Sequence, residues 1–233
     1  LGVINTIGLK DFIIFDLGGA STEVTLVKNR HIVKAVSLPI GALTLTGTYQ
    51  KGDEYTPKEL EKMTKAVKKT IKEHTWLQNI KLPLLGIGGT ARNIAKIDQR
   101  KLSYPITKLH NYELPYHRFH EILEDVKGKS LEARKKISGL SSDRADIIIA
   151  GLTIVDELFN YVNTKTLVVG GCGLREGLFY DYYGENYLGG NSIIEDILVH
   201  SAENVLLGMT KHELVHAKYI TKLATTLYDA LEP

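Results

Sequence analysis

Three apolar runs of this chain end in paired glycines, and this repeated arrangement restricts the possible folds more than any other feature. The runs and their glycines are Asp11–Asp16 with Gly18-Gly19, Leu82–Ile87 with Gly88-Gly89, and Thr166–Val169 with Gly170-Gly171. Short apolar runs bounded by glycine are typical of buried strands. Helical patterns follow the second and third runs. The order of the elements therefore predicts an α/β domain with a mixed sheet flanked by helices.

Two more strands are predicted beside the first run, Thr22–Lys28 and His31–Leu38, because their apolar residues alternate as in a half-buried hairpin. Thr56-Pro57-Lys58-Glu59 has the form of a capping box with proline at the first helical position, which predicts a helix to about His74. Further helices are predicted over Ala91–Ile97, Pro115–Asp125, Leu131–Ile137, Asp143–Tyr161, from Gly173 to about Tyr183, Ile193–Leu207 and Lys211–Leu231.

The bulk composition excludes several classes of protein. Of 233 residues, 43% are hydrophobic and 24% charged, which is typical of globular domains. The formal charge of +2 lacks the basic excess of a DNA-binding protein. The longest apolar stretch, near Ala145–Val155, falls short of the roughly 20 residues of a membrane span. Cys172 is the single cysteine, so a disulfide framework is excluded and a cytoplasmic location is expected.

The first glycine turn has the residues needed to hold both a phosphate and a metal ion. Gly18 and Gly19 allow backbone N–H groups to converge on an anion, and Ser21 and Thr22 offer hydroxyl donors. Asp16 ends one strand and Glu23 lies at the start of the next, so both carboxylates can face one position. Mg²⁺ is commonly held by one or two carboxylates together with phosphate oxygens and water. A plain glycine-containing hairpin with surface acids is the alternative.

Five motifs in this order resemble signatures of the Ppx/GppA phosphatases, which belong to the actin-like, Hsp70-like and sugar-kinase superfamily. The motifs are Asp16–Glu23, Pro39–Ala42, Gly88–Ala91, Arg144–Asp146 and Gly173–Gly177, and the resemblance covers about residues 11–183. Ala20 departs from the family pattern, which commonly has a third glycine there. The resemblance implies a ribonuclease-H-like domain over residues 1–186. It also implies that residues 187–233 are a helical extension, the start of an HD-like domain.

The resemblance also implies an activity and a division of labour along the chain. Family members release terminal phosphate from polyphosphate or from pppGpp, so inorganic polyphosphate or guanosine penta/tetraphosphate is the expected ligand. Gly18, Gly19, Ala20, Ser21 and Thr22 would then hold phosphate, and Asp16 and Glu23 would hold Mg²⁺ or another divalent cation. Gly88, Gly89 and Thr90 resemble a segment that contacts the nucleoside in kinase relatives.

No catalytic residue is assigned in this chain, because the first phosphate loop and the general base of the family precede the part that Leu1 matches. Leu1 is not an initiator residue, so we expect a piece of a longer enzyme that hydrolyses almost nothing alone. A homodimer of the full-length enzyme is a further open expectation.

Two other classes of function remain open at this point. One is a kinase-like or Hsp70-like ATPase lobe of the same superfamily. The other is a non-catalytic module that binds polyphosphate or guanosine alarmones. The residues do not indicate whether polyphosphate or pppGpp is preferred. They also do not indicate the oligomeric state.

Three further features are set aside in favour of ordinary structural explanations. His212-Glu213-Leu214-Val215-His216 matches the zinc-protease pattern, but only a short tail follows and no third ligand is evident. His110, His117 and His120 lack companion ligands. The lysines of the segment Lys58–Lys72 are typical of a solvated helix face, although a track for a polyanionic substrate is the alternative.

Overall fold

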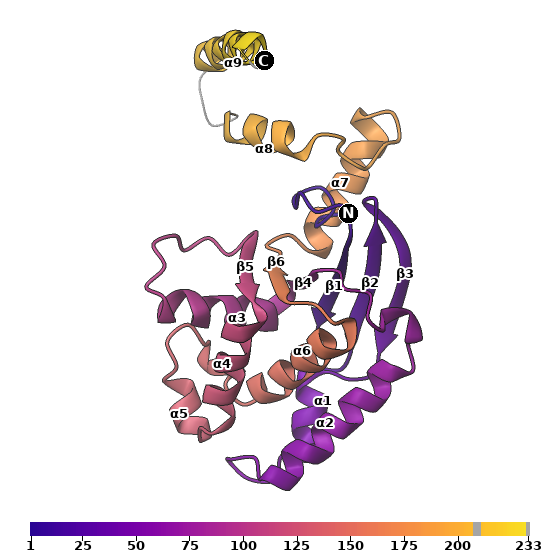
Figure 1. The fold of residues 1–233 in the computed structure, drawn as a ribbon, viewed down its shortest axis with the longest axis vertical. Helices are drawn as coiled ribbons and strands as arrows, with labels where there is room; N and C mark the ends of the chain where they lie inside the picture. The colour runs from indigo at the N-terminus through magenta and orange to yellow at the C-terminus, as the bar shows by residue number, and fades with distance from the viewer. Residues whose placement is uncertain (207–210, 232–233) are drawn as a thin grey trace.

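A computed structural model describes residues 1–206 and 211–231 of the chain (Figure 1). The sheet contains β1 (Phe12–Leu17), β2 (Thr22–Lys28), β3 (His31–Leu38), β4 (Leu84–Ile87), β5 (Tyr112–Pro115) and β6 (Thr166–Val169). The α-helices are α1 (Ala42–Tyr49), α2 (Pro57–Lys72), α3 (Gly88–Lys101), α4 (Tyr116–Lys127), α5 (Leu131–Lys135), α6 (Ile148–Val162), α7 (Leu174–Tyr187), α8 (Ile197–Leu206) and α9 (Lys211–Leu231). Short 3₁₀ turns lie at Thr75–Leu77 and Ser142–Arg144.

The six strands form one mixed sheet in the order β3-β2-β1-β4-β6-β5. β1 and β4 are parallel, as are β4 and β6, whereas the β1–β2, β2–β3 and β5–β6 pairs are antiparallel. The predicted hairpin is confirmed, and it turns at Asn29 and Arg30, whose φ angles are both positive (48° and 63°). The prediction of a mixed sheet flanked by helices is therefore confirmed.

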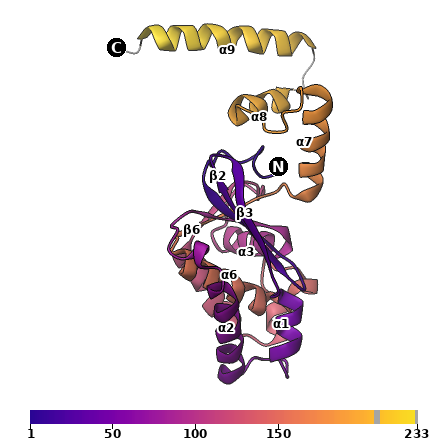
Figure 2. The same ribbon diagram turned by 90° about the vertical axis from the view of Figure 1, so that its right-hand side faces the viewer.

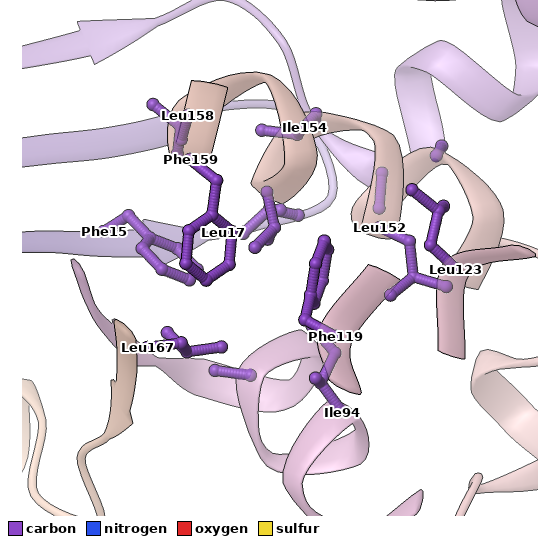
Figure 3. Packing of buried hydrophobic residues seen from close by; sticks show 14 of the residues in the cluster. Phe15, Leu17, Ile94, Phe119, Leu123, Leu152, Ile154, Leu158, Phe159 and Leu167 are labelled. Carbon is purple, nitrogen blue, oxygen red and sulfur yellow. The ribbon is translucent and has the colours of Figure 1, made fainter. Parts of the chain in front are cut away.

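The two faces of the sheet are covered by different parts of the chain, because successive strand residues point to opposite sides. Ile13, Phe15 and Leu17 of β1 join the main hydrophobic core, which also contains buried side chains of α2, α3, α4 and α6. Figure 3 shows this core around the rings of Phe119 and Phe159, whose centroids are 5.1 Å apart. Phe12 and Ile14 face the other way.

A smaller cluster on that second face is built from the N-terminal segment. Val3, Ile4 and Ile7 pack there against Phe12, with Leu85 and Val168 from the neighbouring strands. The first residues also contact the start of α7, since a Cβ at Gly2 would lie 2.5 Å from the carbonyl oxygen of Gly173 (Figures 1 and 2). Asp16 points to this second face, away from the main helical layer.

Several predicted boundaries differ from those in the structure. The capping box at Thr56 is confirmed, with Thr56 Oγ1 accepting from the Glu59 N–H at 3.3 Å. The helix predicted over Asp143–Tyr161 is instead a 3₁₀ turn followed by α6. The sequence patterns did not indicate α1 or β5.

The predicted C-terminal helical extension is present as α8 and α9, although Leu207 falls outside the described residues. The division at residue 186 and the HD-like character of the tail remain predictions. Within residues 1–206 and 211–231, no helix combines the length and the apolar content needed to cross a membrane.

Candidate functional site

The three glycine turns follow the carboxyl ends of three adjacent parallel strands. β1, β4 and β6 lie side by side, with Asp16 opposite Ile87 and Gly86 opposite Val169. The N–H of Gly170 donates to the carbonyl of Gly86 at 2.9 Å, which extends the pairing into the third turn. Segments separated by more than 70 residues of sequence thus meet at one edge of the sheet, which is where ligands bind in open α/β sheets.

Asp16 and Glu23 lie directly opposite each other in the antiparallel pair of β1 and β2. Opposed residues in such a pair project from the same face of the sheet. Glu23 is exposed, and its Oε1 accepts hydrogen bonds from the hydroxyls of Ser21 at 2.7 Å and Ser37 at 2.8 Å. Asp16 is half-buried, and no described side chain donates a hydrogen bond to it. The two acids predicted as metal ligands therefore project from the same face of the sheet, and both line one cavity.

The electrostatic environment shifts the pKa values of the two acids in opposite directions. Burial raises the pKa of Asp16 above its ordinary value, the charge of Glu23 raises it further, and the nearby Arg92 guanidinium opposes both effects. The hydrogen bond from Ser21 lowers the pKa of Glu23, partial burial opposes it, and the bond from Ser37 lowers it further. Two like charges in a cross-strand pair repel each other, and a bound cation would relieve that repulsion.

The bend between β1 and β2 is held by the N-terminus of α1. The carbonyl of Gly18 accepts from the Ala42 N–H at 3.0 Å, and the carbonyl of Gly19 accepts from the N–H groups of Leu43 and Thr44 at 2.9 and 3.0 Å. These bonds satisfy amides that would otherwise lack partners at the start of a helix. Gly41 permits the contact, because a Cβ there would lie 2.4 Å from the carbonyl oxygen of Gly19.

The carbonyls of Gly18 and Gly19 face α1. The Gly18 N–H, which was expected to help hold phosphate, is already used within the turn, because it donates to the Ser21 carbonyl at 2.9 Å. Among the described residues, no acceptor is bonded to the N–H groups of Gly19, Ala20 or Ser21. Convergent amides of this kind suit an anion. The Thr22 hydroxyl was expected to add a donor, and that expectation is wrong. Thr22 is fully buried and its hydroxyl donates to the Ile40 carbonyl at 2.7 Å.

The second glycine turn begins α3 and borders the Asp16 carboxylate. Gly88 has a φ of +84°, and a Cβ there would lie 2.7 Å from Asp16 Oδ1. A Cβ at Gly89 would lie 3.2 Å from the guanidinium carbon of Arg144, so this side chain rests against the turn. Thr90 is buried against Gly151 of α6 and does not face Asp16. Gly88 of the predicted second turn therefore borders the cleft, whereas Gly89 packs against Arg144 and Thr90 serves helix packing.

The third glycine turn completes a small cavity of about 190 Å³ that Asp16, Gly88 and Arg92 also line. Glu176 Oε2 accepts from the Gly173 N–H at 2.7 Å, which closes the start of α7. His110 Nδ1 accepts from the Gly171 N–H at 3.0 Å, and its Nε2 lies 2.9 Å from the Thr6 carbonyl. His110 thus ties this turn to the N-terminal segment, and both of its ring nitrogens are occupied.

The remaining sequence features lie away from the Asp16 cleft. His117 and His120 are exposed on α4. His216 is exposed on α9, and the side chain of His212 is outside those that the structure describes. In the described part of the chain, no three His, Cys, Asp or Glu residues group as a metal site. The lysines of α2 lie in the helical layer on the opposite face of the sheet from Asp16, since Met63, Val67 and Ile71 enter the main core.

Comparison with known proteins finds a family whose model matches most of the chain. A model of the Ppx/GppA phosphatase family matches residues 1–185. Exopolyphosphatase 2 of Mycobacterium tuberculosis is 26% identical over 151 residues, covering 63% of this chain and 46% of that protein. The guanosine-5'-triphosphate,3'-diphosphate pyrophosphatase of Pseudoalteromonas translucida is 26% identical over 173 residues, covering 74% of this chain and 34% of that protein.

A solved structure of the Aquifex aeolicus Ppx/GppA phosphatase superimposes with a TM-score of 0.69 at 28% identity, covering 77% of this chain and 59% of the Aquifex chain. The expectation of a ribonuclease-H-like, actin-like fold is thereby confirmed. The chain spans less than half the length of either sequence relative.

Proposed function

The chain belongs to the Ppx/GppA phosphatase family, and on that premise we propose that it binds a divalent cation and terminal phosphates for hydrolytic release of orthophosphate. The family model covers residues 1–185, which include the three glycine turns. The single observation that carries the proposal is the opposition of Asp16 and Glu23 beside a bend in which the N–H groups of Gly19, Ala20 and Ser21 have no acceptor among the described residues. A cytoplasmic location and the formation of a homodimer accompany the proposal.

The pair of acids fits Mg²⁺ better than it fits a metal held by protein alone. Mg²⁺ usually keeps several waters and takes one or two carboxylates together with phosphate oxygens. Asp16 and Glu23 supply two carboxylates on one face of the sheet, with the Gly19–Ser21 amides nearby in sequence for the phosphate. When bound, the cation would neutralise part of the charge on the phosphoryl oxygens.

The protein groups themselves position the phosphate and stabilise its charge. The N–H groups of Gly19, Ala20 and Ser21 would donate hydrogen bonds to a phosphoryl oxygen, and their positions are fixed because α1 binds the carbonyls of the bend. Arg92 lines the cavity beside Asp16 and adds a positive charge there. Phosphoryl transfer depends chiefly on such positioning and charge stabilisation. The group that activates water is not assigned among these residues.

The proposed substrate is inorganic polyphosphate or guanosine pentaphosphate. This proposal follows the names of the two relatives, one an exopolyphosphatase and the other a guanosine-5'-triphosphate,3'-diphosphate pyrophosphatase. An ATPase of the same superfamily, or a binding module without turnover, would use the same cleft. A titration with ATP beside one with polyphosphate separates these possibilities.

The decisive test is cation binding by the intact protein. Mn²⁺ serves as the probe cation, and electron paramagnetic resonance measures its binding. We expect Asp16→Asn and Glu23→Gln each to weaken Mn²⁺ binding at least tenfold and to lower phosphate release from polyphosphate. Glu113→Gln is the matched control, since Glu113 is also an exposed strand acid but lies on β5 at the far edge of the sheet. Equal Mn²⁺ affinity in all three variants would refute the proposal.

A further inference from the structure

A second cavity, separate from the Asp16 cleft, lies along the C-terminal half of α3. Its volume is about 520 Å³, and none of its nine lining residues is acidic. Two cations and four hydroxyl groups line it: Lys96, Arg100, Tyr104, Thr107, Ser138 and Ser141. This combination of positive charge and hydroxyl donors matches the chemistry of a phosphate ligand.

The two cations of this cavity are free of internal partners in the described part of the chain. Neither Lys96 nor Arg100 forms an ion pair there, although lysines elsewhere on the surface pair with acids. Asp98 lies between them in sequence but points away. It is almost fully buried, and its Oδ2 accepts from the Tyr112 hydroxyl at 2.6 Å and lies 3.1 Å from the Arg118 guanidinium.

The walls of the cavity are fixed to α3 from both sides. The turn at Gly139 has a φ of +93° and approaches so closely that a Cβ would lie 2.6 Å from the Lys96 carbonyl. Asn93 Oδ1 accepts from the Ser141 N–H at 2.8 Å. On the other side, the buried Gln99 amide donates to the Lys108 carbonyl at 3.1 Å. The site is therefore formed before any ligand binds.

α3 joins this cavity to the Asp16 cleft by a row of cations. Arg92, Lys96 and Arg100 recur every four residues and are all exposed, so they follow one face of the helix. Arg92 lines the cleft that contains Asp16, and the other two line the second cavity. A helix rises about 1.5 Å per residue, so the row extends about 12 Å. A single orthophosphate cannot span it.

We infer that this α3 cavity binds the distal part of a condensed phosphate chain whose terminal phosphate lies in the Asp16 cleft. The inference rests on the proposed function and narrows its substrate class to linear inorganic polyphosphate of several units. The row on α3 begins at the cleft, whereas no residue of the more basic helix α2 lines that cleft. The number of positive charges on a helix therefore does not by itself determine where the phosphate chain binds.

The test compares long-chain polyphosphate with tripolyphosphate in the intact protein carrying Lys96→Gln and Arg100→Gln together. We expect affinity for the long chain to fall about tenfold while affinity for tripolyphosphate changes less than twofold. The dependence of long-chain affinity on salt should also become shallower, by about 0.7 in the logarithmic slope for each phosphate that the variant leaves unneutralised.

The control carries Lys62→Gln and Lys69→Gln, which remove the same charge from exposed positions of α2. Loss of long-chain affinity in this control to the same extent, or equal losses for long and short phosphates in the α3 variant, would overturn the inference. Mn²⁺ binding is measured in every variant. Failure of the wild-type protein to bind Mn²⁺ would count against the proposed function, whereas retained Mn²⁺ binding without chain-length discrimination would count against the α3 cavity alone.

Discussion

The Cα of Gly88 lies against the carboxylate of Asp16, so that a Cβ at residue 88 would come within 2.7 Å of Asp16 Oδ1. Gly88 is also in the left-handed region of φ, which disfavours side chains. The absence of a side chain at the first residue of α3 thus leaves room for an acid on β1.

The substitution Gly88→Ala should damage the site through this contact. We expect a loss of about 1–2 kcal/mol in the free energy of unfolding from the positive φ, together with at least tenfold weaker Mn²⁺ binding from the displaced Asp16. Chemical denaturation and Mn²⁺ titration measure the two effects. Gly128→Ala is the control, because Gly128 has a φ of −83° and open space around it, so alanine there should not lower the free energy of unfolding and should leave Mn²⁺ binding unchanged.

Alanine substitutions at two glycines, one at the start and one in the middle of α1, should change the stability of the protein in opposite directions. Gly41→Ala places a methyl group 2.4 Å from the Gly19 carbonyl, and such overpacking costs typically about 1–3 kcal/mol. Gly47 lies within α1, and no atom lies within 4 Å of the position that a Cβ would take there. Gly47→Ala should therefore stabilise the protein by about 0.5–1 kcal/mol. Thermal unfolding reports both. Similar effects at the two positions would contradict the capping of the bend by α1.

The pKa of Asp16 should fall when its neighbour loses charge. Since Glu23 contributes to the raised pKa of Asp16, Glu23→Gln should lower it, and carbonyl-detected NMR titration measures the change. Glu113→Gln should leave it unchanged. An identical Asp16 titration in wild type and Glu23→Gln would refute the electrostatic coupling.

The same shift has a consequence for stability with a defined sign. A carboxyl whose pKa is raised by folding contributes stability at low pH, and this contribution is lost as the pH rises through the folded pKa. Without divalent cations, Asp16→Asn should therefore have a higher melting temperature than wild type at pH 7. The difference should vanish near pH 4, close to the ordinary pKa of about 3.9 for aspartate.

Substitutions at Thr22 and Ser21 should distinguish a hydroxyl that stabilises the fold from one that is accessible. Thr22→Val leaves the buried Ile40 carbonyl without its donor, at a cost of about 1–3 kcal/mol, and should not alter phosphate affinity. Ser21→Ala should change stability by less than about 0.5 kcal/mol but raise the pKa of Glu23, because it removes a hydrogen bond to that carboxylate. Denaturation and NMR titration distinguish the two outcomes.

Local patterns in the sequence predicted the hairpin and the pairing of the two acids. Alternation over Thr22–Lys28 and His31–Leu38 fixed both strand bounds, and the seven-residue separation of Asp16 and Glu23 across a short turn put them on one face. The same alternation indicates an inward Thr22, since Thr22 and the buried Val24 are two residues apart.

Elements that depend on distant contacts were not predictable in this way. α1 contains three threonines and Gly47, which are poor helix formers, and its N-terminus is completed by carbonyls of the bend between β1 and β2. β5 is an edge strand of four residues that ends at Pro115. The approach of Arg144 to Gly89 joins segments 55 residues apart, and no local pattern encodes it.

The attachment of α1 to the Gly18–Ser21 bend also limits how this segment can change during evolution. Insertion of one residue into the bend would move the Gly18 and Gly19 carbonyls out of register with the helix amides. Homologous chains that retain α1 should consequently vary here by replacement of side chains, as at Ala20, while the number of residues stays constant.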